Sequence, residues 1–247
     1  MYRLKSIKLY FFSILKLFLV KSKGIYLKSN YYNKTLLTEK PKRIFYIPSS
    51  FLLSPLTTDE NKIYKITDIS LDSLWETKLK NKFEFENLHA FFWLTKLDRK
   101  SSKVSIQKII TSWIDNFFNY NKQTWEMVIT AKRIISWISN TDISLQDSNN
   151  LYKEKFFSCL VKQSNFLLRN IKKFPYNSKR IICCSAIILS GLIFKETRSN
   201  FGNGIKELEK TILIYFDKNG FPKSRNTEGV FVSLQYLILI REWLKES

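Results

Sequence analysis

The chain has few of the residues that interrupt helices. Only six glycines and five prolines occur in 247 residues, a shortage that disfavours a turn-rich β fold and favours long helices. Hydrophobic residues make up 45% and aromatic residues 15% of the chain, which excludes a disordered composition and allows a sizeable core. The composition therefore predicts a helical protein with one large domain or two small ones.

Residues that hold metals or form disulfides are also scarce. His89 is the only histidine, which excludes a His-rich metal site and any mechanism that needs two histidines. Cys159, Cys183 and Cys184 have neither the spacing of a zinc site nor that of a disulfide framework, and they are interpreted as core thiols. The chain also lacks a phosphate loop, a dinucleotide fingerprint, HExxH and GxSxG. We expect no metal and no cofactor.

Acidic residues are half as frequent as basic ones. The chain has 21 Asp and Glu against 41 Lys and Arg, for a formal net charge of +20. Such a charge attracts an anionic partner, which could be nucleic acid, a membrane surface or an acidic polysaccharide. Lys, Asn and Ile are abundant together, however, which is also typical of an AT-rich coding background. Both explanations of the charge stand at this point.

Residues 1–24 combine basic residues with an apolar stretch, 9–20, which Lys16 interrupts. The stretch is short and charged for a transmembrane helix, and no small-residue cleavage site of a signal peptide follows it. On a helical wheel one side carries lysines and the roughly opposite side apolar residues: Lys5, Lys8, Lys16 and Lys23 against Ile7, Phe11, Ile14 and Phe18. The pattern predicts a basic amphipathic helix, which either contacts a membrane peripherally or caps the domain. We expect the cap.

The rest of the chain divides into an irregular lead-in, 25–70, and a helical domain, 71–247. The lead-in contains one extended stretch, RIFYIPSSFLL. In the helical domain apolar residues recur with a period of 3.6 residues, and short connections favour antiparallel neighbours. This rhythm is typical of an α/α toroid and of a generic helical bundle alike. Helices are expected over roughly 86–98, 103–119, 125–138, 149–172, 178–195, 203–217 and 228–245.

Two helical stretches carry pairs of residues suited to binding. In ENLHAFFWLTKL, His89 and Trp93 are four positions apart and share a helix face. In TWEMVITAKRIISWISN, Arg133 and Trp137 have the same spacing, and an arginine beside aromatic faces suits sugar stacking and carboxylate binding. Both pairs are also common in ordinary helix packing.

A polar turn, NGFPKSRNTEG (219–229), stands out near the C-terminus. Gly220 and Pro222 end one helix. Asn226 or Thr227 can cap the next helix, whose first backbone N–H groups then point towards an anion. The turn is thus a helix stop followed by a helix start.

Taken in order, several stretches resemble the helical domain of heparinase II/III-type polysaccharide lyases. They are LHAFFWL, W…AKRIISWIS, a helix with GLIF, and NGFPKSRN before an apolar helix. The resemblance is nearest to the bacterial branch whose turn reads DGG-x-x-SRN, and RIFYIPSSFLL is similar to that branch's lead-in. It covers roughly 43–244. It implies an incomplete α/α toroid followed by a β-sandwich, and a periplasmic or cell-envelope location, with a cytoplasmic location still open because no clear signal peptide is present.

The resemblance also implies β-elimination on uronate-containing glycans. That reaction builds negative charge on the uronate carboxylate, which Arg, Asn or a cation must neutralise, while Tyr or His takes the proton. Asn226 and Arg225 are expected to meet the carboxylate, and His89 to complete the catalytic set. The expected substrate-binding residues are Arg133, Trp137, Trp93 and Asn177.

The chain departs from the better-known branches at two points. They open the helix before GLFF with an Asn-His pair, where YNSKRIICC has Asn177 followed by Ser178 and Lys179. They also place a tyrosine a few residues after the arginine of the turn, where this chain has Gly229 or Val230. The β-sandwich has no counterpart in the 247 residues, so a separately encoded one is an expected partner beside the anionic polysaccharide.

Two functions follow for the chain. The first is a lyase-like domain that binds uronate-containing glycans, or cleaves them by β-elimination with such a partner. The alternative is a basic all-α protein that binds nucleic acid or acts as a non-catalytic interaction protein. Against nucleic acid, the charges are scattered along the chain and no known binding motif occurs.

Overall fold

A computed structural model describes residues 2–38, 41–56, 75, 82–97 and 103–247. The regular secondary structure of this described part is helical, and an isolated β-bridge joins Phe216 and Pro222. The predicted all-α class is confirmed. The helices are α1 (Tyr2–Lys28), α2 (Asn30–Thr35), α3 (Lys82–Ala90), α4 (Lys103–Phe117), α5 (Met127–Ser139), α6 (Thr141–Ser144), α7 (Asn150–Ile171), α8 (Ser178–Ile193), α9 (Arg198–Tyr215) and α10 (Thr227–Glu246), with 3₁₀ turns η1 (Ser50–Leu56) and η2 (Phe92–Lys96).

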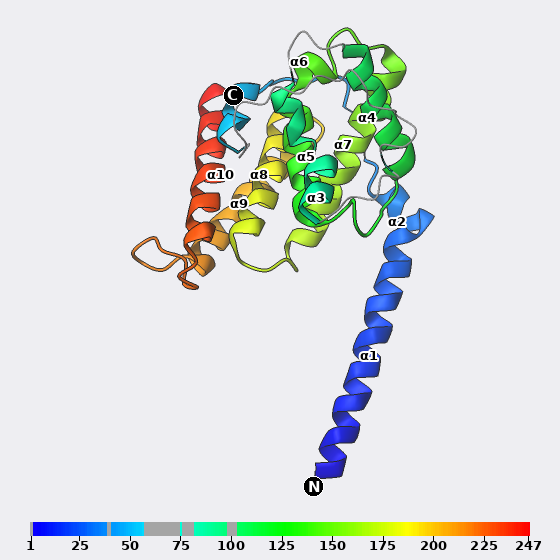
Figure 1. Ribbon diagram of the computed structural model, residues 1–247, viewed down its shortest axis with the longest axis vertical. Helices are drawn as coiled ribbons and strands as arrows, with labels where there is room; N and C mark the ends of the chain where they lie inside the picture. Colours follow the sequence, from blue (N-terminus) through cyan, green and yellow to red (C-terminus); the bar gives the residue numbers. More distant parts are fainter. Residues whose placement is uncertain (1, 39–40, 57–74, 76–81, 98–102) are drawn as a thin grey trace.

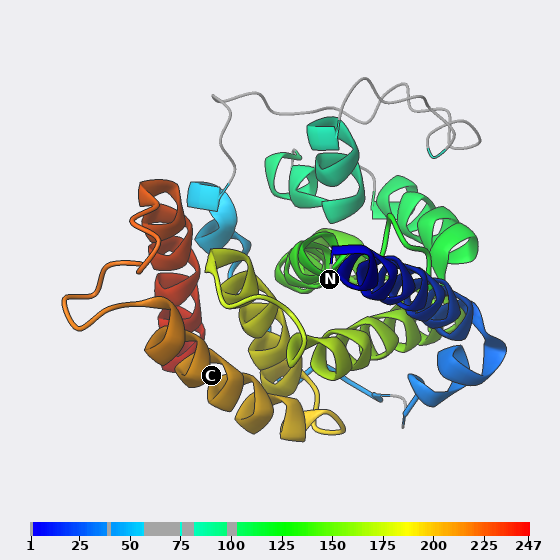
Figure 2. The same cartoon turned by 90° about the horizontal axis from the view of Figure 1, so that it is seen from below.

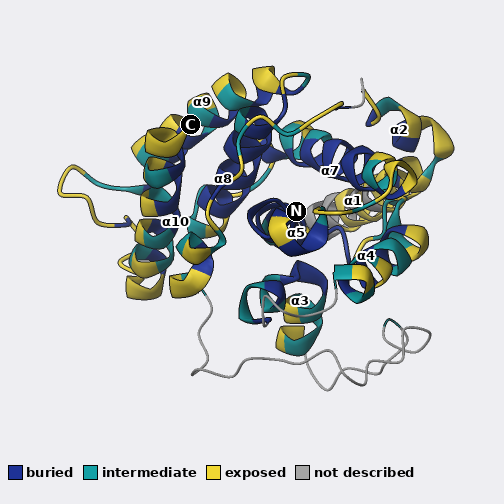
Figure 3. Cartoon of the chain, turned by 90° about the horizontal axis from the view of Figure 1, so that it is seen from above, coloured by how far each residue is buried: buried dark blue, intermediate teal, exposed yellow. Residues whose placement is uncertain are grey.

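Two helices, α5 and α8, form the centre of the body (Figure 3). Helix α8 packs against α5, α7, α9 and α10, and α5 also packs against α3 and α7. In α5 the side chain of Lys132 is the only one that is not buried. A helix that is buried on nearly all sides must be surrounded by other helices, and its buried polar side chains must find partners inside the protein.

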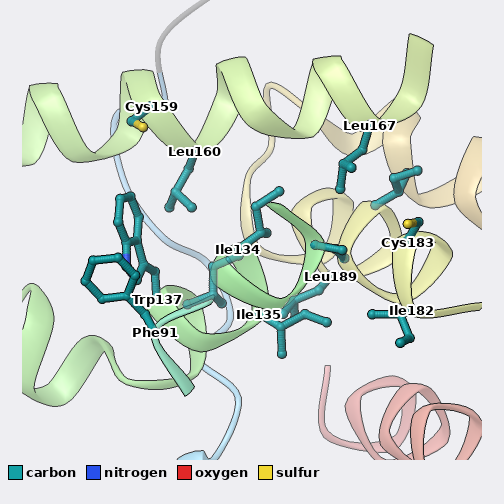
Figure 4. Packing of buried hydrophobic residues seen from close by; sticks show 14 of the residues in the cluster. Phe91, Ile134, Ile135, Trp137, Cys159, Leu160, Leu167, Ile182, Cys183 and Leu189 are labelled. Carbon is teal, nitrogen blue, oxygen red and sulfur yellow. The ribbon is translucent and has the colours of Figure 1, made fainter. Parts of the chain in front are cut away.

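The core is rich in aromatic rings. The indole of Trp137 lies 5.5 Å from that of Trp113 and 5.4 Å from the ring of Phe156, measured between centroids. Figure 4 shows Trp137 and Phe91 beside Cys159 and Leu160 of α7. The three cysteines are free and buried, as the core-thiol interpretation predicts. The Trp137–Trp113 pair is edge-to-face and the Trp137–Phe156 pair is stacked, and aromatic pairs of either geometry contribute about 0.5–1.5 kcal/mol beyond their buried area.

Most helices begin and end close to their predicted limits. Helices α4, α5, α7, α8 and α10 agree with the predicted ranges to within two residues at each end. Helix α9 begins earlier than predicted, at Arg198. The agreement follows from the strong apolar period and from side-chain caps such as Asn149, whose Oδ1 accepts the Tyr152 N–H at 2.8 Å.

The predicted helix over 86–98 is wrong. Helix α3 ends at Ala90, Phe91 adopts a left-handed conformation with φ 60°, and a 3₁₀ turn follows. Left-handed backbone costs about 1–2 kcal/mol outside glycine. Two tertiary contacts offset this cost: the Ser136 hydroxyl donates to the Phe91 carbonyl at 2.6 Å, and the Phe91 ring packs on Trp137.

Helix α1 does not cap the domain, so that expectation is wrong. Figure 1 shows α1 leaving the body at α2 and extending away from it, and in Figure 2 the N-terminus lies in front of the other helices. Leu27 is the one buried residue among the α1 side chains that the structure describes. Within the described residues no helix is long and apolar enough to cross a membrane.

The start of the lead-in contains more helix than predicted. It contains the end of α1, the whole of α2 and the turn η1. The described residues between α2 and η1, 36–38 and 41–49, are without helix. The Phe45 N–H donates to the Ile193 carbonyl at the end of α8 at 2.9 Å. The second half of the lead-in, 57–70, lies outside the described residues.

Candidate functional site

Helices α5, α8 and α10 each begin with a side-chain cap. Glu126 accepts the N–H groups of Val128 and Ile129 at 2.8 and 3.0 Å. Asn177 caps α8 in the same way by accepting the Arg180 N–H at 3.2 Å, and Asn226 caps α10 by accepting the Gly229 N–H at 3.3 Å. A cap satisfies only one or two of the free N–H groups of a first turn, so each helix start keeps a partial positive charge.

The three caps lie at the same end of the body and line two adjoining pockets. In Figure 1 this is the lower end, where the turn before α10 (orange) is found. The first pocket, of about 480 Å³, includes Glu126 and Asn226 in its wall, and the second, of about 360 Å³, includes Asn177 and Asn226. Ser178, Lys179 and Asn226 belong to both walls. We call the two pockets together the cap site.

The two pockets differ in charge. The larger one is lined by three lysines and three glutamates and is called the mixed-charge pocket: Lys82, Lys132, Lys179, Glu86, Glu126 and Glu228. The smaller one, the basic pocket, is lined by Lys179 and Lys223 and by no acidic residue. Two helix starts and two ammonium groups therefore favour an anion in the basic pocket.

Lys132 brings a partly desolvated ammonium to the mixed-charge pocket. Burial lowers the pKa of Lys132, and Lys179 lowers it further, while Glu86 and Glu126 act in the opposite direction. Its Nζ lies 5.8 Å from the centroid of the Phe92 ring. Because this ammonium has already lost hydration, it gives up less water when an anion or a sugar hydroxyl binds.

A tyrosine reaches the cap site from helix α9. Tyr215 is buried, lines the basic pocket, and presses its hydroxyl against the first turn of α10. A Cβ atom added to Gly229 would lie 2.3 Å from the Tyr215 Oη, so only glycine leaves room for this hydroxyl. The better-known branches of the family that the chain resembles have a tyrosine after the turn, where this chain has Gly229 or Val230. Here the hydroxyl of Tyr215, from the helix before the turn, lies beside Gly229.

No local signal in the sequence marks Tyr215, because its position depends on how α9 and α10 pack. Lys132, Lys179 and Lys223 were missed for a related reason. They are three among many lysines, and only the tertiary structure distinguishes those that line a pocket.

The turn 219–229 has its own internal support. Asp217 Oδ1 accepts the N–H groups of Asn219 and Phe221 at 2.9 and 3.1 Å, and these bonds, the Phe221 bond first, lower the pKa of the Asp217 carboxyl. Arg225 has a left-handed backbone with φ 58°, and its guanidinium pairs with Asp217 at 2.9 Å. Arg225 thus stands between two lining residues, Ser224 and Asn226, but lines neither pocket itself.

His89 and Arg133 lie in the interior. The Trp113 Nε1 donates to His89 Nδ1 at 3.0 Å, and Arg133 Nη1 donates to the carbonyls of His89 and Thr124 at 2.8 and 3.0 Å. Arg133 Nε also donates to Gln163 Oε1 at 3.1 Å. We call these residues the interior arginine cluster. It joins α3, α5 and α7, and its arginine is held by neutral acceptors.

Burial shifts both titratable groups of the interior arginine cluster. It lowers the pKa of His89 to about 4, with a smaller contribution from the Arg133 charge, and it lowers the pKa of Arg133 to about 9. Arg133 has no exposed surface, and its guanidinium stacks 4.0 Å from the Trp113 ring centroid. The expected catalytic role of His89 and the expected substrate role of Arg133 are therefore wrong, because neither side chain can reach a polysaccharide.

The two tryptophans are structural as well. Trp137 is fully buried in the aromatic core, so its expected contact with substrate is also wrong. Trp93 is half-buried, donates from Nε1 to the Leu88 carbonyl at 3.2 Å, and stacks on Phe91. Neither tryptophan lines the cap site. Of the residues expected at a site, Asn177 and Asn226 are the two that line the cap site.

Comparison of the chain with protein-family models, with curated proteins and with solved structures finds no match. Among the described residues no cluster of three His, Cys, Asp or Glu side chains is suited to holding a metal ion. The chemistry of the cap site therefore has to be argued from its own amides, ammonium groups and hydroxyls.

Proposed function

We propose that the cap site binds an anionic, uronate-containing polysaccharide, and that the chain is the helical domain of a heparinase II/III-type polysaccharide lyase. The observation that carries this proposal is the meeting of Asn177 and Asn226. The resemblance singles out these two asparagines, which are far apart in the sequence, and both line the basic pocket.

The helix arrangement supports the fold part of the proposal. Helices α5, α8 and α10 begin at one end of the body, and α7 and α9 return the chain to that end between them. Packed neighbours such as α7–α8 and α8–α9 are the kind of unit from which an α/α toroid of antiparallel helix pairs would be built. In such a toroid the cap site would open at the end where the inner helices start.

The basic pocket has the parts needed to hold a uronate carboxylate. The carboxylate would accept hydrogen bonds from the N–H groups that start α8 and α10 and from the amide groups of Asn177 and Asn226. Lys179 and Lys223 would neutralise its charge. Lys223 Nζ donates to the Ile214 carbonyl at 2.9 Å, which fixes the ammonium and leaves two of its hydrogens for a ligand.

Elimination needs a proton acceptor beside this anion site. The C–H bond next to the uronate carboxylate breaks, its proton passes to a base, and the glycosidic oxygen leaves with a proton from an acid. With His89 in the interior, we assign proton transfer to Tyr215, which lines the basic pocket together with both asparagines. As the phenolate it would take the C–H proton and then give that proton to the leaving glycosidic oxygen. Charge that builds on the carboxylate would be stabilised by the helix starts and by Lys179.

Binding is tested by adding a negative charge to the pocket without losing a cap. In Asn226→Asp the carboxylate still caps α10, since Asp and Asn cap about equally well. We expect the Kd for alginate or heparan sulfate, measured by calorimetry, to rise about tenfold or more through like-charge repulsion. Asn149→Asp is the matched control, because Asn149 caps α7 and lines neither pocket of the cap site.

Unchanged binding by the Asn226→Asp variant, or no uronan binding by the unmodified chain, would refute the proposal. Salt-sensitive binding to nucleic acid with none to uronans would favour the nucleic-acid alternative. Cleavage is read separately, as absorbance of the unsaturated uronate, with and without a separately encoded β-sandwich protein. An increase of this absorbance should be absent in the Tyr215→Phe variant, which should still bind uronan.

A further inference from the structure

Helix α1 presents an apolar face that no described part of the chain covers. Phe11, Ile14, Leu15, Phe18 and Ile25 recur at helical spacing on one side, and each side chain is between 42% and 67% exposed. The flanks of this face carry further exposed apolar side chains, those of Tyr10, Phe12, Leu17 and Leu19. Soluble monomers rarely leave large aromatic and aliphatic side chains exposed in a continuous row. The face therefore indicates a docking surface.

Among the described contacts, those that join α1 to the body lie at the C-terminal end of the helix. The rings of Tyr26 and Tyr32 lie 5.1 Å apart, and Asn33 Nδ2 donates to the Leu27 carbonyl at 3.4 Å. Helix α2 is in turn fixed to the body, because Asn33 Oδ1 accepts the Tyr120 N–H at 3.0 Å. The body thus holds α1 at one end and leaves the rest of it available to a partner (Figure 1).

The charge of this segment specifies the partner. Residues 1–38 contain eight basic residues and no acidic one, so that all 21 acidic residues of the chain lie in 39–247. Of the basic residues, Lys21, Lys23 and Lys28 on α1 and Lys34 on α2 have described and exposed side chains. Clustered lysines beside exposed aromatic residues complement anionic lipid headgroups above an apolar layer.

The length of the apolar stretch decides between lying on the membrane and crossing it. Residues 9–20 span only about 18 Å as a helix, against about 30 Å for the hydrocarbon core. Lys16 interrupts the stretch, and no helix in the described residues meets the requirements for a span. The geometry favours a helix that lies in the plane of the surface.

We propose that α1 binds the surface of an anionic lipid membrane. Phe11, Ile14, Leu15 and Phe18 enter the boundary between headgroups and acyl chains, and the flanking lysines contact the headgroups. Helix α2 then holds the body next to the membrane. This proposal does not depend on the function of the cap site.

The test is sedimentation of the full chain with vesicles. We expect binding to vesicles of phosphatidylcholine mixed with phosphatidylglycerol, weak binding to phosphatidylcholine alone, and release by high salt. The double variant Phe11→Ser with Phe18→Ser should lower partitioning at least about tenfold, and Lys21→Gln with Lys23→Gln about 30-fold. Matched controls on the body are Phe231→Ser and the pair Lys206→Gln with Lys218→Gln, all exposed positions, which should bind as the unmodified chain does.

Several results would overturn the proposal. The first is that the chain does not bind vesicles, and the second is that it binds neutral and anionic vesicles equally. The third is that the control variants lose as much vesicle binding as the α1 variants do. Release by detergent but not by salt would indicate an inserted anchor instead of a surface helix. A concentration-dependent oligomer that the Phe11 and Phe18 variant dissolves, without any vesicle binding, would assign the face to a second copy. A lower urea midpoint in that variant would show that α1 packs on the body, which also refutes the proposal.

Discussion

The interior arginine cluster and the cap site contain similar side chains with different capacities for binding. In the cluster, Arg133 donates to two carbonyls and to Gln163 and has no exposed surface. At the cap site, Lys179 is exposed, and Asn177 and Asn226 cap helices beside a pocket. The comparison teaches that the type of residue does not identify a site. What matters is whether its hydrogen-bonding groups are already engaged and shielded from water.

The largest effect is expected from breaking the interior cluster. Arg133→Met should lower the free energy of unfolding by about 3–5 kcal/mol, because it leaves buried acceptors of His89, Thr124 and Gln163 without donors. Urea denaturation measures the change. Uronan binding by the fraction that remains folded should be unchanged, and a loss below about 1 kcal/mol would contradict the structural role of Arg133.

The pH dependence of stability tests the same cluster. The pKa of His89 is lowered to about 4 in the folded chain, so the unfolded chain takes up the proton first as the pH falls through about 6.5. The stabilisation is complete above pH 6.5 and is lost between pH 6.5 and 4, which amounts to about 2 kcal/mol between pH 7 and 5. Urea midpoints at these two pH values should show it. His89→Gln should flatten this dependence, and an equally steep profile in that variant would assign the effect to other groups.

An intermediate effect is expected where α9 meets α10. Gly229→Ala brings a Cβ within 2.3 Å of the Tyr215 Oη and should cost about 1–3 kcal/mol through overpacking. Adding Tyr215→Phe removes the clashing oxygen, and the ring carbon that remains lies at an ordinary contact distance of 3.6 Å.

A double-mutant cycle from urea denaturation should therefore give a favourable coupling of about 1 kcal/mol or more. Strictly additive effects would show that the Tyr215 hydroxyl does not occupy the place described.

The smallest effect on stability, with a clear effect on binding, is expected at Lys179. Lys179→Gln should change the free energy of unfolding by less than about 0.5 kcal/mol, since the side chain is exposed. It should raise the Kd for uronan about fivefold and lower the salt dependence of binding. Lys206→Gln on α9 makes the same charge change away from the cap site. Equal behaviour of the two variants would remove the distinction between pocket lysines and other lysines.

Local patterns in the sequence anticipated a good part of this structure. The apolar period predicted α4, α5, α7, α8 and α10. The turn residues indicated Asn226 or Thr227 as the cap of α10, and the structure shows that it is Asn226. The site was anticipated only in part. His89, Arg133 and Trp137 share the residue types of a sugar site, but their spacing could not show that other helices cover them.

The sequence by itself determined the all-α class, the main helices and their caps, because propensity, periodicity and capping act over a few residues. Only the tertiary structure decided which polar groups remain open to a ligand. Contacts between segments that are distant in the chain bury Arg133 and place Tyr215 beside Gly229. The lack of such contacts leaves α1 exposed. Packing between helices sets these features, and no local pattern encodes it.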